Sequence, residues 1–213
     1  MTRIAYNFLY VMTCFFAFFG RFAQAEEKIK DGDKYEYATF ASGCFWCTQH
    51  DFDHIKGVIS TTAGFTGGEK VNPTYEEVSA GGSGHVESLE VKYDPKVVSY
   101  QELLDFYWQN VDPTRNDGQF CDKGSQYRPV IFYHTENQKE LAEKSKNQLI
   151  AANQIHPILV EILPAKKFYP AEEYHQNYYK KNPIRYKFYR YNCGRDARLK
   201  EIWGKSVELL KFK

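Results

Sequence analysis

Residues 34–47 read KYEYATFASGCFWC, and they contain the turn from strand to helix on which the fold depends. Polar and apolar side chains alternate over residues 34–41, which predicts a β-strand with one buried face. Ser42-Gly43 ends that strand, because glycine permits a sharp turn of the backbone. A helix is then predicted to begin at Cys44 and to end before Gly57, since glycine is common directly after a helix.

The segments that follow predict further strands and helices in mixed order. Strands are predicted over residues 58–65, 86–93, 129–133 and 158–163. Ser99 and Thr135 each open a capping-box pattern, which predicts helices over residues 99–111 and 135–153. The remaining predictions are a helical turn over 75–78, a helix over 171–178 and an irregular tail from Tyr186 with a last helical turn or two. Because strict βαβ alternation is lacking, we predict an α+β two-layer sandwich with a mixed β-sheet.

The composition excludes several classes of protein. The 213-residue chain carries 28 Lys and Arg against 27 Asp and Glu, a formal net charge of +1. This balance argues against a nucleic-acid or acidic membrane partner, since both attract a basic excess. Aromatic residues make up 17% of the chain, far more than disordered segments carry. No repeat or low-complexity linker divides the chain, so we predict a single domain over residues 26–213.

Residues 1–25 have the pattern of a secretory signal peptide. Arg3 supplies a positive charge, residues 8–19 are almost wholly apolar, and Ala23-Gln24-Ala25 is a typical cleavage pattern. We therefore predict a periplasmic or secreted protein, cleaved after Ala25. The alternative is a leader that stays uncleaved and anchors the chain in a membrane. Both methionines of the chain lie in this leader, so the predicted mature protein has none.

Beyond the leader lie four cysteines: Cys44, Cys47, Cys121 and Cys193. The C-x-x-C pair at the predicted helix start indicates a redox-active dithiol. The first turn of a helix presents unpaired N–H groups, so the pKa of Cys44 is predicted to lie below the free value of about 8.5. The alternatives are structural cysteines or half of a zinc site, which would need a second ligand pair. Between the pair, Phe45 and Trp46 form either a small apolar pocket or part of the core.

Two other clusters contain candidate catalytic groups. Glu87 lies in the strand predicted at residues 86–93, in phase with Leu89 and Val91. A carboxyl on the apolar face would have a raised pKa and could act as a general acid, whereas a solvated glutamate is the alternative. The neighbouring His85 is interpreted as a hydrogen-bonding residue of the turn. Farther along, Asp122 and Tyr127 are five residues apart across a glycine turn and could converge on a ligand.

Six segments together resemble one enzyme family. They occur in the order GCFWC (43–47), GFTGG (64–68), NPTY (72–75), GHVE (84–87), DPT (112–114) and DKGSQYR (122–128). Each motif is weak alone, but the set in register is similar to the peptide methionine sulfoxide reductases of the A type. The resemblance runs from about Phe40 to Phe132 and continues more weakly to CGRD at residues 193–196.

This resemblance implies a fold, a reaction and a set of roles. The fold is expected to have a ferredoxin-like core, and the reaction to be reduction of methionine S-sulfoxide, in proteins and as the free amino acid. Cys44 matches the nucleophile and Glu87 the acid that protonates the sulfoxide oxygen. The resemblance also assigns positioning roles: Tyr75 and Tyr127 hold the oxygen, Asp122 orients the site, and Phe45 and Trp46 receive the methyl group.

A thioredoxin-like reductant is implied as partner, and no metal or organic cofactor is needed. The resulting Cys44 sulfenic acid would condense with a second thiol to a disulfide. We expect a monomer, which is the default for such a chain.

The resolving thiol stays open at this point. Family members usually have glycine where Cys47 stands, one helical turn after Cys44. A disulfide between them needs a Cα separation near 5.5 Å and some local unwinding. Cys193 resembles the place where many members carry a resolving cysteine, and Cys121 directly precedes Asp122, so all three are candidates. Two other functions also remain: a general thiol–disulfide oxidoreductase that uses Cys44 and Cys47, and a non-enzymatic module that binds methionine-containing segments.

Overall fold

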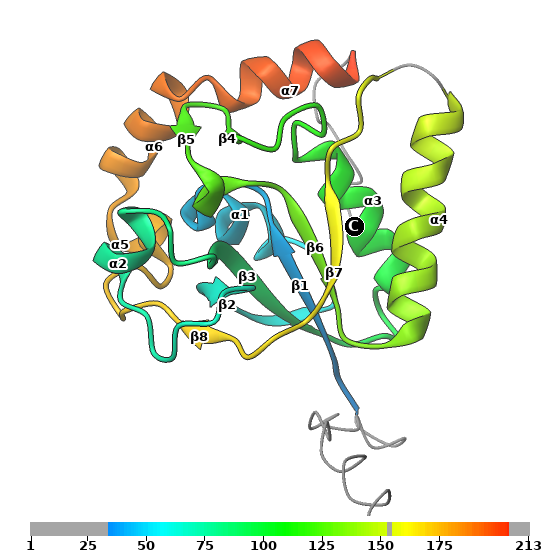
Figure 1. Ribbon diagram of the computed structural model, residues 1–213, viewed down its shortest axis with the longest axis horizontal. Helices are drawn as coiled ribbons and strands as arrows, with labels where there is room; N and C mark the ends of the chain where they lie inside the picture. Colours follow the sequence, from blue (N-terminus) through cyan, green and yellow to red (C-terminus); the bar gives the residue numbers. More distant parts are fainter. Residues whose placement is uncertain (1–33, 153–154, 205–213) are drawn as a thin grey trace, which may run out of the picture. The chain divides into compact units, whose positions relative to one another are not determined.

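Six strands form one mixed sheet in a computed structural model that describes residues 34–152 and 155–204 (Figure 1). The strands lie in the order β7-β6-β1-β3-β2-β8. Their bounds are β1 Glu36–Ala41, β2 Val58–Thr66, β3 Val86–Tyr93, β6 Val130–Tyr133, β7 Glu161–Pro164 and β8 Tyr169–Pro170. All neighbours pair antiparallel except β6 and β7, which are parallel, so the predicted mixed sheet is confirmed. The predicted signal peptide at residues 1–25 lies outside the described residues.

Four strands and two helices of this sheet have the ferredoxin-like order. Helix α1, Phe45–Phe52, follows β1, and α3, Tyr100–Gln109, follows β3. The succession β1-α1-β2-β3-α3-β6 with sheet order β6-β1-β3-β2 is the βαββαβ arrangement. Phe40 of β1 stacks on Phe52 of α1 and on Tyr107 of α3, with ring centroids 5.1 and 5.2 Å apart. Both helices therefore pack on the sheet through one aromatic core, which confirms the α+β prediction.

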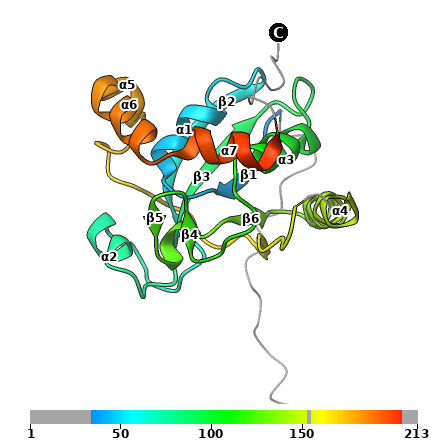
Figure 2. The ribbon, with the colours of Figure 1, turned by 90° about the horizontal axis from the view of Figure 1, so that it is seen from above.

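The other helices lie around this core. They are α2 Tyr75–Ser79, α4 Glu136–Ala152, α5 Tyr178–Lys181, α6 Pro183–Asn192 and α7 Arg195–Trp203. Seen from above, α4 stands end-on at one edge of the molecule, and α2, α5 and α6 lie toward the opposite edge (Figure 2). Within the described segments, none of the helices is long and apolar enough to cross a membrane.

The two predicted capping boxes differ in outcome. Ser99 Oγ accepts from the Glu102 N–H at 3.2 Å and Glu102 Oε2 accepts from the Ser99 N–H at 2.7 Å, so the first box is complete. In the second, the Gln138 N–H donates to Thr135 Oγ1 at 3.2 Å, but Gln138 Oε1 accepts from the His134 N–H. Gln138 Nε2 also donates to the Tyr37 carbonyl at 2.7 Å, so this side chain fastens α4 to β1 instead of closing the box.

The helix predicted over residues 171–178 is wrong. Residues 173–177 form turns, and α5 begins only at Tyr178. Gln176 accepts from the Ala63 N–H at 2.9 Å and donates to the Ala63 carbonyl at 2.8 Å, next to the residues of β2 that pair with β8. Asn177 has a left-handed backbone with φ of 53°, which ends any helix there. Contacts with the sheet therefore override the local helical pattern.

The irregular tail predicted from Tyr186 is also wrong. Helix α6 begins with Pro183 in its first turn, where proline is favoured, and α7 follows after Gly194, whose φ is 70°. The pattern was hidden because α6 is not conventionally amphipathic. Ile184 and Phe188 are 85% and 71% exposed although both are large and apolar.

Candidate active site

Cys44 lies at the turn from β1 into α1, where it is the N-cap residue of the helix. Gly43 before it has a φ of 87°, and a Cβ there would lie 2.7 Å from the Cβ of Gln119. Glycine is therefore needed for both backbone and space. The Cys44 carbonyl accepts from the N–H groups of Cys47 and Thr48 at 3.1 and 3.3 Å, which starts the helix. The predicted strand–glycine–helix junction is confirmed.

Glu87 reaches the same junction from β3. Its Oε2 accepts from the Phe45 N–H, the first of α1, at 3.0 Å, and the side chain is 2% exposed. Burial raises the pKa of Glu87 to about 8, although the hydrogen bond from Phe45 acts in the opposite direction. At neutral pH this carboxyl is therefore protonated and can donate a proton. The sequence-based expectation of a buried, raised carboxyl agrees with this geometry.

Two phenols lie near enough to this carboxyl for its charge to affect their pKa. Tyr75 begins α2, and Tyr127 ends the 3₁₀ turn Ser125–Tyr127. Burial raises the pKa of Tyr75 to about 12, and the neighbouring charges of Glu87 and Cys44 add to the increase. Burial also raises the pKa of Tyr127, again with contributions from Glu87 and Cys44. Both hydroxyls thus keep their protons and share one site with the acid and the thiol.

Asp122 lies near enough to Cys44 to affect its pKa and has a partner that the sequence did not predict. It belongs to β5, Asp122–Lys123, which forms a small hairpin with β4, Gly118–Gln119. The Tyr189 hydroxyl of α6 donates to Asp122 Oδ2 at 2.7 Å. Burial, followed by the charges of Cys44 and Asp122, raises the pKa of Tyr189. Tyr189 is therefore a further site residue, which was missed because the tail was predicted to be irregular.

The pKa of Cys44 is raised, so the prediction of a low value is wrong. Burial is the largest cause, since the side chain is only 7% exposed. The hydrogen bond with Cys47 raises the pKa further, the first N–H of α1 donates to Glu87 and not to the thiol, and the Glu87 and Asp122 carboxyls repel a thiolate when they are ionised. Cys44 therefore rests as a thiol in the free protein.

The pKa of Cys47 is shifted in the opposite direction. It is 2% exposed, packs with Tyr178 and Tyr186, and is a free thiol like Cys44. The hydrogen bond from Cys44 lowers the pKa of Cys47, and the charges of Arg195 and Arg190 act in the same direction. The two thiols therefore face each other, with Cys44 as donor.

Both arginines form ion pairs with the buried Asp51. Arg190 Nη1 lies 2.7 Å from Asp51 Oδ1, and Arg195 Nε lies 3.7 Å from Asp51 Oδ2. Arg195 is 1% exposed and donates to the Ser42 and Asn110 carbonyls at 2.9 and 2.7 Å. This cluster ties the junction before Cys44 to the start of α7.

Comparison with known proteins now identifies the family. The family model described as peptide methionine sulfoxide reductase matches residues 36–207. The chain belongs to the peptide methionine sulfoxide reductase family.

Relatives and solved structures agree with this assignment. The chain is 49% identical over 174 residues to peptide methionine sulfoxide reductase MsrA of Bacillus licheniformis, which covers 81% of this chain and 96% of that protein. It is 45% identical over 188 residues to MsrA/MsrB of Vibrio cholerae, which covers 86% of this chain but only 50% of that longer protein. The reduced form of Mxr1 from Saccharomyces cerevisiae is 38% identical with a TM-score of 0.64, covering 72% of this chain and 88% of Mxr1. Methionine sulfoxide reductase A of Corynebacterium diphtheriae is 34% identical with a TM-score of 0.64, covering 75% and 81%.

Contacts with neighbouring side chains hold both Phe45 and Trp46 of this reductase family member in place. Phe45 is 1% exposed and packs with Phe65 and Tyr75, so it belongs to the core and to the wall of the site at once. Trp46 stacks on Tyr178 with ring centroids 3.8 Å apart and donates from Nε1 to His175 Nδ1 at 3.0 Å. His175 and Tyr178 come from the segment wrongly predicted as a helix.

Cys121 and Cys193 form a disulfide with each other. Cys193 Sγ lies 3.9 Å from Asp122 Oδ2, so the bond adjoins the site without entering it. Cys121, Asp122 and Cys193 also form a group of metal-ligand type, with ligand atoms within 4.8 Å of one another. Because both sulfurs are bonded, they are not thiolate ligands, and the group does not fit a zinc site in this state.

His85 has the structural role that the sequence predicted. It is 1% exposed, its Nε2 lies 2.8 Å from the Lys70 carbonyl, and its Nδ1 accepts from the Gly68 N–H at 3.3 Å. Both ring nitrogens are thus occupied in holding the loop after β2.

Proposed function

We propose that this protein reduces methionine S-sulfoxide to methionine with Cys44 as the nucleophile. The observation that carries the proposal is the buried Cys44 thiol beside the protonated Glu87 carboxyl. Glu87 and the hydroxyls of Tyr75 and Tyr127 would bind the sulfoxide oxygen. Phe45 and Trp46 would receive the methyl group, because they offer a fixed apolar surface next to the thiol. Asp122, held by Tyr189, would orient the substrate side of Cys44.

The chemistry balances with the groups present. Cys44 sulfur bonds to the sulfoxide sulfur while Glu87 transfers its proton to the oxygen, which makes the sulfoxide electrophilic. The oxygen then passes to Cys44, so methionine leaves and a Cys44 sulfenic acid remains. The proton lost by the Cys44 thiol restores Glu87. Methionine sulfoxide is thus reduced by two electrons and the Cys44 sulfur oxidised by two.

A peptide that contains one methionine sulfoxide tests this proposal. With dithiothreitol as reductant, we expect the S epimer to be converted to methionine and the R epimer to stay unchanged. Insulin serves as the control substrate, because a general thiol–disulfide oxidoreductase would reduce its disulfides without a sulfoxide. Insulin reduction without sulfoxide reduction would refute the proposal.

We propose Cys47 as the thiol that resolves the sulfenic acid. Cys121 and Cys193 are bonded to each other, whereas Cys47 is free and faces Cys44. Cys44 is the N-cap, with a non-helical ψ of 120°, so a bond to Cys47 requires little unwinding of α1. Attack by Cys47 releases water and leaves a Cys44–Cys47 disulfide, which a thioredoxin-like dithiol would reduce.

Replacing Cys47 by Ser should separate the two half-reactions. We expect the reduced variant to release one equivalent of methionine in a single turnover, because Cys44 and Glu87 remain. Recycling by a thioredoxin-class protein should be lost, since no disulfide forms at the site. Rapid quench for methionine and steady-state turnover measure the two steps. Unchanged recycling would transfer the resolving role to Cys193.

We also propose that residues 1–25 direct export and are removed. When the full chain is expressed in a bacterium, we expect the mature protein to begin at Glu26 and to be found outside the cytoplasm. Replacing Ala23 and Ala25 by Asp should leave the leader attached, because the cleavage site requires small residues. Mass spectrometry of the purified chains reads the outcome. A wild-type chain that retains residues 1–25 would support the membrane-anchored alternative.

A further inference from the structure

Cys47 lies on a face of α1 that also carries a buried ion-pair cluster. Asp51 comes four residues after Cys47, and side chains at this spacing lie one above the other on a helix. Arg190 Nη1 lies 2.7 Å from Asp51 Oδ1, and Arg195 Nε lies 3.7 Å from Asp51 Oδ2. Arg190 Nη1 also donates to the hydroxyl of Tyr186 at 3.0 Å, and Tyr186 packs with Cys47. We call Arg190, Arg195 and Asp51 the arginine cluster.

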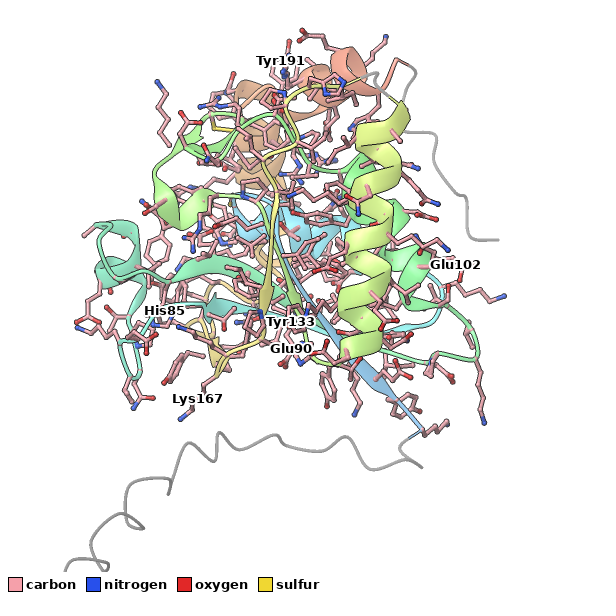
Figure 3. The ribbon with its side chains drawn as sticks, turned by 45° about the vertical axis from the view of Figure 1, so that its right-hand side comes forward. His85, Glu90, Glu102, Tyr133, Lys167 and Tyr191 are labelled. Atoms are coloured by element: carbon pink, nitrogen blue, oxygen red, sulfur yellow. A yellow bond between two sulfur atoms is a disulfide. The ribbon has the colours of Figure 1, made fainter. Side chains whose placement is uncertain are left out.

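The C-terminal helices supply both arginines from inside the fold. Arg190 belongs to α6 and has a side chain that is 15% exposed, and Arg195 begins α7 with one that is 2% exposed. Figure 3 shows Tyr191, the next residue along α6, at the outer edge of the molecule, whereas Arg190 contacts the buried Asp51. Because little water reaches the two guanidinium groups, their charges act more strongly than surface charges do.

The buried part of the cluster has an excess of positive charge. Arginine stays charged in proteins, so Arg190 and Arg195 contribute two positive charges. Burial opposes ionisation of Asp51, but Arg190 is the largest of the causes that together lower its pKa, so Asp51 contributes one negative charge. Asp196 pairs with Arg190 at 2.7 Å but is 67% exposed, so water and salt screen its charge. A thiolate at Cys47 would therefore balance the buried charge.

The other acidic groups around the two thiols leave this excess in place. Burial raises the pKa of Glu87 to about 8, so this carboxyl is uncharged at neutral pH. Burial also raises the pKa of Asp122, whose Oδ2 accepts from the Tyr189 hydroxyl. Cys44 donates its thiol hydrogen bond to Cys47, which favours negative charge on the accepting sulfur.

The remaining titratable groups that face Cys47 are the phenols of Tyr178, Tyr179, Tyr186 and Tyr189 and the imidazole of His50. A phenol is uncharged near neutral pH, and burial raises the pKa of Tyr186 and of Tyr189 further. The ring of His50 packs against Tyr186 with centroids 5.2 Å apart, and its Nδ1 lies 3.0 Å from Asp51 Oδ1. A proton on His50 would add charge of the same sign as the arginines. These five groups therefore do not oppose a thiolate at Cys47.

We propose that the arginine cluster is a positioning device that keeps Cys47 as a thiolate, ready to attack the sulfenic acid of Cys44. The inference rests on the proposed function, in which Cys47 is the resolving thiol. Only the thiolate form of a cysteine is a nucleophile, and a neighbouring guanidinium favours that form. The cluster thus acts on the second half of the reaction, after methionine has left.

The resolving step balances with these groups. The Cys47 sulfur bonds to the Cys44 sulfur, and the S–O bond of the sulfenic acid breaks. The departing hydroxyl takes a proton from Glu87 and leaves as water. The Cys47 sulfur is formally oxidised by one electron and the Cys44 sulfur reduced by one.

The thiolate of Cys47 can be titrated by itself. In a full chain that carries Cys14→Ser and Cys44→Ser, Cys47 is the one free thiol of the five cysteines in the sequence, because Cys121 and Cys193 are bonded to each other. Serine at position 44 keeps a hydroxyl that can donate to Cys47. We expect the ultraviolet absorbance of the thiolate to appear with a midpoint below about 8.5, the value of a free cysteine.

Three variants in this background test the cluster. Arg190→Gln should raise the midpoint by about one pH unit or more, the usual effect of losing a neighbouring opposite charge. Arg190→Lys keeps the charge and should keep the parent midpoint. Asp51→Asn should lower the midpoint, because it removes the buried negative charge and leaves both guanidinium groups. Arg185→Gln, at an exposed arginine of α6, is the matched control and should change nothing.

The signs of these shifts separate an electrostatic role from a structural one. A disturbed fold would move the midpoint toward the value of a free thiol in both Arg190→Gln and Asp51→Asn, whereas the cluster predicts opposite shifts. If Arg190→Gln does not fold, the downward shift in Asp51→Asn still supports the inference and an upward shift refutes it. An unshifted midpoint in a folded Arg190→Gln would also overturn it.

The rate of the resolving step gives a second readout, in chains that keep Cys44. After one turnover with a sulfoxide peptide, alkylation and mass spectrometry measure the formation of the Cys44–Cys47 disulfide. For a shift of one unit, the thiolate in Arg190→Gln is about tenfold scarcer at low pH but about threefold more nucleophilic. Resolution should therefore be about threefold slower than in the parent below both midpoints and about threefold faster above them. Loss of the Glu87 proton affects both chains alike, so it cancels in this comparison.

A variant that resolves more slowly at every pH would indicate a displaced thiol and overturn the inference. The titration uses no sulfoxide, so it reads the cluster even in a chain that lacks reductase activity. Opposite shifts in Arg190→Gln and Asp51→Asn without any disulfide formation would place the fault in the proposed reaction and not in the effect of the cluster on Cys47.

Discussion

Replacing Cys44 by Ser should abolish methionine formation with every reductant, dithiothreitol included. The reaction needs a sulfur nucleophile that can accept the sulfoxide oxygen and give it up again, and a hydroxyl does neither. Serine has nearly the volume of cysteine, and Cys44 makes no side-chain capping bond, so the start of α1 should stay intact. The measurement is methionine released from a sulfoxide peptide in a single turnover.

The matched control is Cys47→Ser, which makes the same replacement of sulfur by oxygen one helical turn away. It should still give one equivalent of methionine, whereas Cys44→Ser should give none. The unfolding temperatures of both variants should lie close to that of the wild type, because each replaces a buried sulfur by oxygen. Full activity of Cys44→Ser would refute the proposed reaction and favour a binding module that has no need of the thiol.

The sequence predicts the part of the site that is local. Alternation in β1, the glycine break and the C-x-x-C pair lie within a few residues, so pattern alone positions Cys44. Glu87 is predictable for the same reason, since its phase with Leu89 assigns it to the buried face of a strand. The family resemblance supplies the remaining residues, because Tyr75, Tyr127 and Asp122 come from separate segments whose convergence no local pattern shows.

The sequence-based predictions that were wrong concern features that depend on contacts between distant segments. The raised pKa of Cys44 follows first from burial and then from the hydrogen bond with Cys47, and Glu87, 42 residues beyond Phe45, takes the N–H that the thiol was predicted to use. The C-terminal helices were missed because α6 exposes Ile184, Phe188 and Tyr191 and directs only Tyr186 and Tyr189 inward, which is not a conventional amphipathic pattern. Tyr189 and the Cys121–Cys193 bond exist only once that helix has folded back. Cys121 and Cys193 are 72 residues apart, and sequence spacing alone did not distinguish their pairing from the other pairings that four cysteines allow.

Replacing Glu87 by Gln should lower kcat/KM by roughly 10²- to 10⁴-fold, the usual contribution of a positioned general acid. Glutamine keeps an oxygen to accept from the Phe45 N–H but has no acidic proton for the sulfoxide oxygen. Glu90→Gln, in the same strand, is the matched control and should lose little activity.

The pH dependence of the same variant separates an acid from a merely structural residue. With the pKa of Glu87 at about 8, wild-type kcat/KM should fall as pH rises through that value, and Glu87→Gln should lack this fall. Folding stability should also fall as pH rises. The pKa of Glu87 is about 4.5 in the unfolded chain and about 8 in the folded protein. The unfolded chain therefore loses this proton at lower pH, and the free energy of unfolding declines as pH rises from about 4.5 to 8. Glu87→Gln should remove this part of the decline in urea unfolding measured across that range. If the kcat/KM of Glu87→Gln stayed within about threefold of the wild-type value and still fell as pH rose, Glu87 would be excluded as the acid. The proton would then have to come from Tyr75 or Tyr127.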